Sequence, residues 1–344
     1  MRGRLEKLSD LTVSVILPEA ASAAVSDFAK QNEMGALKSR SAEFHTSLAR
    51  APDVMNALEI PRQHLKNSSD RDLQRADGVC RIMVCGSGKA TRIMDVYQQS
   101  PIRILFPKTG DEWAQEAVLV NTAGGVAGGD HLQLSVRALS GASLAVTTQA
   151  AERIYRALDQ SAHINTKLHV GNEARLAWLP QETIVFNHAR FCRRTEIEIS
   201  AGSELLALEC LVLGRAARGE QLSDGAISET WQVKNNGRLQ WADTLRLTND
   251  VFSHVSRKAL LGESTALATL LYFGPELDNR LQFIRALSAS FDCHCGATLV
   301  GGMLVARLAA KSSFELKDAL RSLIHEVGKE LAPGPFRVPK MWSC

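Results

Sequence analysis

The sequence predicts a mainly β fold, in which strands form a two-layered, helical-like stack with two α-helices near the C-terminus. Three observations carry this prediction. Short segments of alternating hydrophobicity follow one another from Gly78 onward, and a strand motif recurs about every 30 residues. Two segments close to the end of the chain have the helical period instead.

The predicted strands are separated by turns rich in glycine, asparagine and aspartate. Apolar and polar residues alternate along most of them, as expected for strands with one face in a core. One segment, 204–213, is apolar almost throughout and predicts a strand buried on both faces. The predicted strands are 132–136, 164–170, 195–199, 204–213, 227–233, 239–247 and 298–308, the last with a bend at Gly301 and Gly302.

A motif recurs within this region: a leucine, one further residue, an apolar residue, and polar residues soon after. Its copies begin at Leu144, Leu176, Leu205 and Leu239, a spacing of about 30 residues that is typical of stacked repeats. Stacking such units would give a helical-like β arrangement with two sheet layers. It would also bring together the polar residues that follow the copies: Thr148, Gln149, Gln181, Glu182, Glu209 and Asp243.

Two segments place their apolar residues on one face of a helix. The first is 276–289, with Pro275 at a plausible start and apolar residues at Leu277, Leu281, Ile284 and Leu287. The second is 314–331, where Ser312 and Glu315 fit a capping box. Its apolar face consists of Leu316, Leu320, Leu323, Ile324 and Val327.

Residues 1–75 differ from the β domain that we expect over 76–344. They have mixed charge, many alanines and serines, and no sustained alternation, which predicts a poorly ordered leader or short helices. Basic residues precede a short apolar run, as in a secretory signal. Acidic residues in and beside that run (Glu6, Asp10 and Glu19) and Pro18 argue against a signal peptide.

Composition excludes several classes of partner. The formal net charge is +3 and aromatic residues make up 6% of the chain, which argues against nucleic acid. The basic cluster of Arg190, Arg193 and Arg194 is expected to be a solvated face, or a docking surface for an acidic protein. No apolar run is long enough to span a membrane. Seven irregularly spaced cysteines do not predict a disulfide framework, and a reducing cytoplasm fits best.

Possible metal ligands are sparse, and the densest group is Cys293, His294 and Cys295. On a strand, Cys293 and Cys295 would point the same way, which suits zinc or nickel. A second ligand pair is missing, so cysteines buried without a metal remain the alternative. The glycine-rich stretch 121–130 lacks the Lys-Ser/Thr of a phosphate-binding loop, so its glycines are expected to serve backbone geometry.

Gln181 and Glu182 stand between two apolar strand segments, 176–179 and 183–186. Polar groups buried there would need partners or water, and Arg153 is one candidate partner. A hydrolase would instead need a second carboxylate facing Glu182, for which the candidates are Asp130, Glu209 and Asp243. No spacing favours the hydrolase over a structural network, and the hydrolase stays as the alternative function.

Four segments in a fixed order resemble a known family: 121–130, 147–155, 178–186 and 213–220. Together with 105–107 and 339–342, they make the chain from Gly78 onward similar to the urease accessory proteins called UreD, or UreH in some organisms. One stretch departs from the family, which usually has Pro-Gly-Gly-Gly where this chain has Asn121-Thr-Ala-Gly124.

The resemblance implies a non-catalytic scaffold with a mainly β fold. Proteins of that family bind the urease apoprotein and recruit UreF, which recruits the GTPase UreG with its nickel. The assembly helps to carbamylate the active-site lysine of urease and to load two nickel ions. For this chain the resemblance therefore implies nickel in transit, no tightly bound cofactor and a cytoplasmic location.

The family is also thought to conduct nickel through an internal water-filled passage. Oxygen ligands and water suit an ion in transit, because a cage of thiolates or imidazoles would trap it. We expect the passage to be lined by Asp130, Thr148, Gln149, Arg153, Gln181 and Glu182. For UreF we expect a surface on the C-terminal helices and tail, with Leu316, Leu320, Leu323, Met341 and Trp342.

Overall fold

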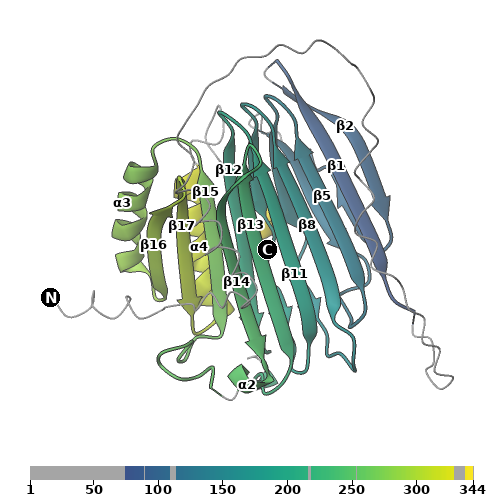
Figure 1. Ribbon diagram of the computed structural model, residues 1–344, viewed down its shortest axis with the longest axis vertical. Helices are drawn as coiled ribbons and strands as arrows, with labels where there is room; N and C mark the ends of the chain where they lie inside the picture. Colours follow the sequence, from purple (N-terminus) through teal and green to yellow (C-terminus); the bar gives the residue numbers. More distant parts are fainter. Residues whose placement is uncertain are drawn as a thin grey trace, which may run out of the picture. The chain divides into compact units, whose positions relative to one another are not determined.

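Two β-sheets packed face to face form the part of the chain that the structure describes (Figure 1). The computed structural model describes residues 74–88, 90–108, 114–215, 218–252, 254–328 and 338–343. All of them except Gln74 belong to one compact unit. The predicted leader lies almost wholly outside the described residues, so that its structure stays a prediction.

The first sheet is mostly parallel. In spatial order its strands are β14 (Arg238–Thr248), β13 (Ala226–Asn235), β11 (Arg190–Ile199), β8 (Ala162–Val170), β5 (His131–Ala138), β1 (Asp77–Ser87) and β2 (Ala90–Gln99). The five inner strands run parallel, and β14 and β2 add antiparallel edges. Every second residue is buried along β8, β11 and most of β13, as the alternating sequence pattern predicts.

The second sheet lies behind the first in the view of Figure 1. In spatial order its strands are β16 (His294–Val300), β17 (Met303–Ala310), β15 (Ala266–Phe273), β12 (Glu204–Leu213), β9 (Arg175–Leu179), β6 (Ser143–Thr148), β4 (Gln115–Asn121) and β3 (Ile102–Leu105). Two short strands extend it, β10 (Thr183–Val185) beside β12 and β7 (Glu152–Ile154) beside β10.

The chain alternates between the sheets and stacks parallel strands one repeat apart. Leu144 lies in register with Leu176, and Leu176 with Leu205, so that the chain returns to the same place after 32 and then 29 residues. The predicted two-layered, helical-like stack is therefore confirmed. The fourth motif copy, at Leu239, lies outside this ladder, because β14 turns back antiparallel to β13 in the other sheet.

Two helices near the C-terminus are also confirmed, α3 (Leu277–Leu287) and α4 (Ser313–Gly328). At the start of α4 the Glu315 N–H donates to Ser312 Oγ over 3.2 Å. The Glu315 carboxylate accepts from the Lys311 N–H over 3.1 Å, one residue before the partner that a capping box would give it. Among the described residues, the other helical turns are α2 (Asn249–Phe252), η2 (Ser288–Ser290) and η4 (Lys340–Ser343).

The segment 298–308, predicted as one bent strand, is a hairpin between β16 and β17. Val300 pairs with Met303 across a two-residue loop. The loop residues Gly301 and Gly302 have φ values of +57° and +74°. Two successive left-handed residues match the twist of a tight hairpin and strain any residue except glycine. The glycine pair thus reverses the chain.

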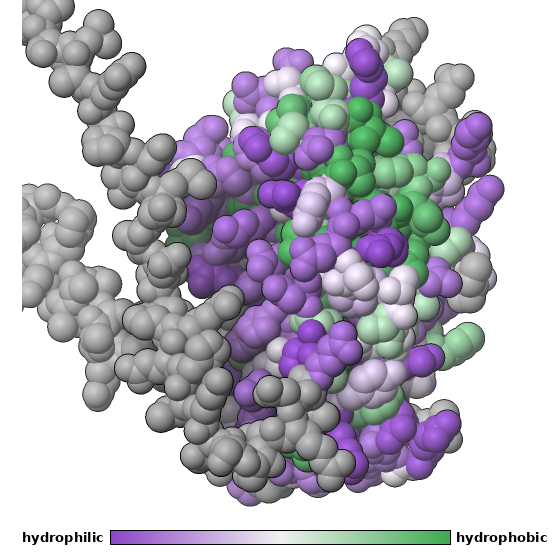
Figure 2. Space-filling view, turned by 90° about the vertical axis from the view of Figure 1, so that its right-hand side faces the viewer, coloured by the Kyte–Doolittle hydropathy of each residue, from purple (hydrophilic) through white to green (hydrophobic). Residues whose placement is uncertain are grey.

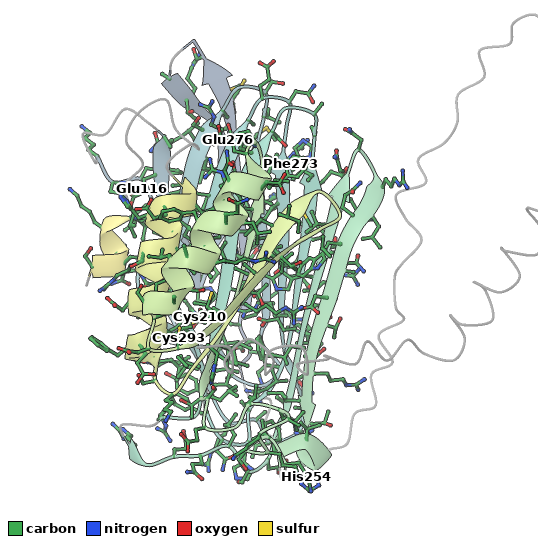
Figure 3. All side chains as sticks on the ribbon, turned by 90° about the vertical axis from the view of Figure 1, so that its left-hand side faces the viewer. Glu116, Cys210, His254, Phe273, Glu276 and Cys293 are labelled. Atoms are coloured by element: carbon green, nitrogen blue, oxygen red, sulfur yellow. The ribbon has the colours of Figure 1, made fainter. Side chains whose placement is uncertain are left out.

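Two hydrophobic cores hold the unit together. The first lies between the sheets, and the second lies between the outer face of the second sheet and the two helices, which Figure 3 shows outside that sheet. Strand β12 contributes to both, with Leu205 and Ala207 in the first core and Leu206 and Leu208 in the second. The prediction of a strand buried on both faces is confirmed.

The edge formed by β2 and β3 exposes several apolar side chains. Figure 2 shows a hydrophobic area on the side of the molecule where β2 lies. Exposed apolar side chains from this edge are Ile93, Met94, Tyr97 and Leu105. Of the helices that the structure describes, none combines the length and hydrophobicity needed to span a bilayer.

Candidate functional site

A cavity of about 210 Å³ lies between the two sheets, in the first hydrophobic core. Its wall is apolar where β5 and β8 contribute Leu132, Leu134 and Ile164. The opposite wall is polar, because several strands of the second sheet end there. Its polar residues are Asn121, Thr148, Gln149, Glu152, Arg153, Gln181, Thr183 and Glu209, and the first sheet adds Thr166 and Arg193.

The ends of β6 and β9 explain part of this polar wall. The two strands are parallel neighbours, so the residues that follow them reach the same edge of the sheet. Thr148 Oγ1 accepts from the Gln181 N–H over 2.9 Å and donates to the Ala150 carbonyl over 3.0 Å. Gln149 is exposed at the mouth of the cavity. Four of the six residues predicted for an internal passage thus line this cavity: Thr148, Gln149, Arg153 and Gln181.

The glycine-rich stretch 121–130 closes one side of the cavity. Asn121 Nδ2 donates to both carboxylate oxygens of Glu152, over 3.1 and 3.2 Å. Burial raises the pKa of Glu152, and the hydrogen bond from Asn121 opposes that rise. At Gly125 a Cβ atom would lie 2.4 Å from the Tyr155 ring. This close approach supports the expectation that the glycines serve backbone geometry.

A buried ion cluster lies at the inner end of the cavity. Arg193 of β11 is paired with Glu229 of β13 and Glu209 of β12, and its Nη1 donates to Thr183 Oγ1 over 2.8 Å. Thr195 Oγ1 donates to Glu209 Oε1 over 2.8 Å. All five residues are less than a tenth exposed. Two carboxyl groups therefore share one guanidinium in a region without bulk water.

The buried groups of this cluster shift one another's pKa values. Burial raises the pKa of Glu209 well above its ordinary value, although Arg193 opposes the rise, and the negative charge of Glu229 raises it further. The two carboxylates raise the pKa of Arg193 against the effect of burial, which keeps the guanidinium charged. Burial thus favours the protonated form of Glu209, and the neighbouring carboxylates favour the charged form of Arg193.

The sequence did not predict this cluster, since Arg193 had been assigned with Arg190 and Arg194 to a solvated or docking surface. The structure corrects this for Arg193, which is buried. Strand alternation was the available signal, because Arg193 stands between Phe191 and Thr195, which both point into the core.

An unpartnered donor also faces the cavity. Trp178 lines it and is only 3% exposed, yet among the described residues its indole N–H has no hydrogen-bond partner. A buried N–H group of this kind needs water or a ligand oxygen. The cavity is therefore suited to holding water or an oxygen-rich guest.

Asp130 and Glu182 do not line the cavity. Asp130 accepts backbone hydrogen bonds from Ala76 and Ala127, over 2.8 and 2.7 Å, and so fixes the glycine-rich loop to the start of β1. Glu182 precedes β10, where Thr183 faces inward, so alternation sends Glu182 to the outer face. There its carboxylate lies 3.3 Å from Lys317 Nζ of α4.

The carboxylates proposed for a hydrolase are not brought together. Glu182 faces α4, Glu209 faces the space between the sheets, and Asp130 holds a loop. Asp243 of β14 pairs with Arg307 of β17 over 2.8 Å. None of the three therefore faces Glu182 across a cleft, and no observation favours the alternative function.

The cluster of Cys293, His294 and Cys295 does not converge on one point. Cys293 immediately precedes the edge strand β16, which begins with His294 and Cys295, and alternation turns His294 away from the two cysteines. Burial raises the pKa of Cys293 and raises that of Cys295 to about 12, which disfavours the thiolates that bind metals. Among the described residues, no group of three or more histidine, cysteine or acidic side chains is placed to hold an ion.

Comparison of the sequence with known proteins shows the family of the chain. The model of the family described as UreD urease accessory protein matches residues 76–343. The chain belongs to the UreD family. It is 40% identical over 270 residues to urease accessory protein UreD of Rhizobium leguminosarum bv. viciae, which covers 78% of this chain and 96% of the relative.

Other UreD proteins are similarly close. The Xanthobacter autotrophicus protein is 42% identical over 270 residues, covering 78% of this chain and 91% of the relative. The protein of Methylorubrum populi called urease accessory protein UreD 2 is 42% identical over 252 residues, covering 72% and 85%.

In this UreD-family chain, the apolar residues predicted to face a partner are mostly internal. Four of them belong to the second hydrophobic core and are at most 1% exposed: Leu316, Leu320, Leu323 and Trp342. The Trp342 indole N–H donates to the Leu179 carbonyl over 3.0 Å, and Gln181 Nε2 donates to the Met341 carbonyl over 2.6 Å. The C-terminal turn is thus fixed to β9 and α4 and does not present Trp342 to solvent.

Proposed function

We propose that this chain is a non-catalytic factor in urease maturation, which binds the urease apoprotein and helps to deliver nickel to it in the cytoplasm. Membership of the UreD family supports the role in urease maturation. The single observation that carries the nickel proposal is the polar cavity between the sheets, with its unpartnered Trp178 N–H. Six free cysteines among the described residues fit a reducing compartment.

In this proposal the cavity is a section of a water-filled nickel passage. Hydroxyl and amide oxygens of Thr148, Gln149 and Gln181 line its polar side, and the Glu209 carboxyl group lies at its inner end. Neutral oxygen ligands bind a hydrated divalent ion weakly, which allows it to move on. Arg153 adds positive charge to the lining, which repels a cation from direct contact, so an ion would travel with most of its water retained.

A substitution that blocks the mouth of the cavity tests the proposed passage. Ala150 is exposed and lines the cavity, so Ala150→Trp places an indole at the opening without disturbing the core. We expect this variant to join the urease complex normally but to activate urease more slowly with nickel. The matched control is Ala242→Trp, at an exposed position of β14 outside the cavity. Equal activation by both variants and the unmodified chain would argue against the passage.

We further propose that UreF, and through it UreG, binds the outer side of the two C-terminal helices. Phe314 of α4 is 79% exposed and Phe283 of α3 is 45% exposed, which is unusual for phenylalanine. Exposed aromatic residues of this kind are common anchors of protein interfaces. They replace the buried leucines and Trp342 as the candidate contacts.

Charge substitution tests this surface. Phe283→Glu and Phe314→Glu should each weaken capture of UreF, because each puts a carboxylate into an apolar contact. Leu239→Glu is the control, since Leu239 is 54% exposed on β14, in the other sheet. Undiminished capture by both phenylalanine variants would remove the helices from the interface. Turnover of any substrate by the purified chain would contradict the non-catalytic role.

A further inference from the structure

Two histidines stand side by side on the outer face of the first sheet. His131 begins β5, His163 lies near the start of β8, and the two are register partners in parallel strands. Their imidazole rings are stacked, with centroids 5.1 Å apart and planes inclined by 12°. His131 is exposed and His163 is partly exposed, so solvent reaches both rings.

Strand alternation fixes the direction of both side chains. Leu132 and Ile164, the next residue of each strand, point inward and line the cavity, so His131 and His163 point outward. The pair is therefore separated from the cavity by the sheet itself. Because neighbouring strands of a sheet are about 4.8 Å apart, two imidazoles in register can reach one small ion.

We propose that His131 and His163 together bind a divalent transition-metal ion, each through one ring nitrogen. Imidazole nitrogen is a favoured ligand of nickel, copper and zinc. Because the ring nitrogens' lone pairs lie in the nearly parallel ring planes, binding requires both rings to rotate about their side-chain bonds toward a common point. Water completes the coordination, since the described residues provide no third histidine, cysteine or acidic side chain placed to hold the ion. The site is consequently open, and its metal exchanges readily.

The neighbouring groups agree with this chemistry. Burial, and to a lesser extent His131, lower the pKa of His163. Cys192 of β11 is the next residue in the same row. Burial raises the pKa of the Cys192 thiol, and the proposed site does not include it. At the other end of the row, exposed Asp77 adds negative charge beside His131.

This metal site does not depend on the proposed function. It lies outside the passage, on residues 131 and 163 alone, and should bind metal in the isolated chain without urease or any other partner. A failure of the urease experiments would leave it standing, and its own failure would leave the passage standing.

The test is calorimetric titration of the full chain with nickel(II) alone, at neutral pH. We expect His131→Asn and His163→Asn each to remove one equivalent of bound nickel, or to weaken it by about tenfold or more, because even loss of a group that supports a ligand costs 10–100-fold. The matched control is His169→Asn, on the same strand and face, whose register neighbours are Arg137 and Glu198. This control should bind nickel like the unmodified chain.

A second measurement uses the unmodified chain, so it does not depend on whether a variant folds. X-ray absorption of the chain loaded with one equivalent of nickel should show two imidazole ligands among oxygen ligands. No binding by the unmodified chain, unaltered binding by both histidine variants, or an equal loss in the His169 control would each overturn the proposal. A spectrum with one imidazole or none would do the same.

Discussion

Replacing Arg193 with methionine should destabilise the protein by about 3–5 kcal/mol, the cost of breaking a buried ion pair by removing one partner. The guanidinium is buried and contacts Glu209, Glu229 and Thr183. Methionine fills most of the volume but leaves Glu229 without a compensating charge. The expected loss is a large fraction of the 5–15 kcal/mol that typically separates the folded and unfolded states.

The two carboxyl groups should respond differently. Glu209→Gln is expected to cost about 1 kcal/mol or less, because the amide oxygen still accepts from Thr195 and the amide N–H can donate to Glu229. Glu229→Gln should cost considerably more, since it removes the charge that compensates Arg193.

The pH dependence follows from the direction of the Glu209 shift. Its folded-state pKa is raised above the ordinary value of 4.5, so its contribution to stability is fully present below pH 4.5. That contribution is lost as the pH rises through the folded-state pKa. Glutamine does not titrate, so Glu209→Gln should gain stability relative to the unmodified chain as the pH increases above 4.5.

Urea unfolding followed by tryptophan fluorescence measures these differences as free energies of unfolding. Arg194→Met is the matched control on the outer face, where Arg194 is half exposed and pairs with Glu196, and it should change stability by less than about 0.5 kcal/mol. The reasoning is refuted if Arg193→Met costs no more than this control. It is also refuted if Glu209→Gln is as damaging as Arg193→Met.

Two further substitutions test the C-terminal region. Trp342→Ala should lower the free energy of unfolding by about 3–5 kcal/mol in the same urea assay, because Trp342 is 1% exposed and its removal leaves a cavity. Phe314→Ala is the control and should change this free energy little, because Phe314 is 79% exposed. Ser312→Ala should cost about 1 kcal/mol and increase amide exchange in the first turn of α4, because Ser312 Oγ accepts the Glu315 N–H; unchanged exchange would count against this capping role.

Much of the fold was predictable because the burial of each strand or helix face is visible in the local pattern of apolar and polar residues. Alternation marked β8 and β13, continuous apolarity marked β12, and helical periodicity marked α3 and α4. The recurring leucines at 144, 176 and 205 predicted the stack, because parallel ladders align residues one repeat apart. Each of these signals depends only on residues near one another in the sequence.

The candidate site was less predictable, because its geometry depends on single-residue offsets at strand ends. Thr148 and Gln181 were expected at the cavity and line it, whereas Glu182, one residue further, faces α4. The apolar face of α4 predicted a helix correctly but could not tell a protein partner from the chain's own sheet. Leu316 and Leu320 pack on that sheet, so this face of α4 is buried within the chain and is not available to a partner.

A step of one residue along β5 and β8 also separates the cavity-lining side chains from the histidine pair, because successive side chains of a strand point to opposite faces. In β5 and β8, inward residues line the cavity that we propose as a passage, and outward residues form the histidine pair. Because a sheet lies between them, substitutions at 131 and 163 should leave the cavity intact, and substitutions at the mouth of the cavity should leave nickel binding by the histidines intact. Combining Ala150→Trp with His163→Asn should therefore give additive effects on urease activation and nickel binding, as expected for sites without shared contacts. A mutual dependence would mean that the histidine pair supplies the passage with metal.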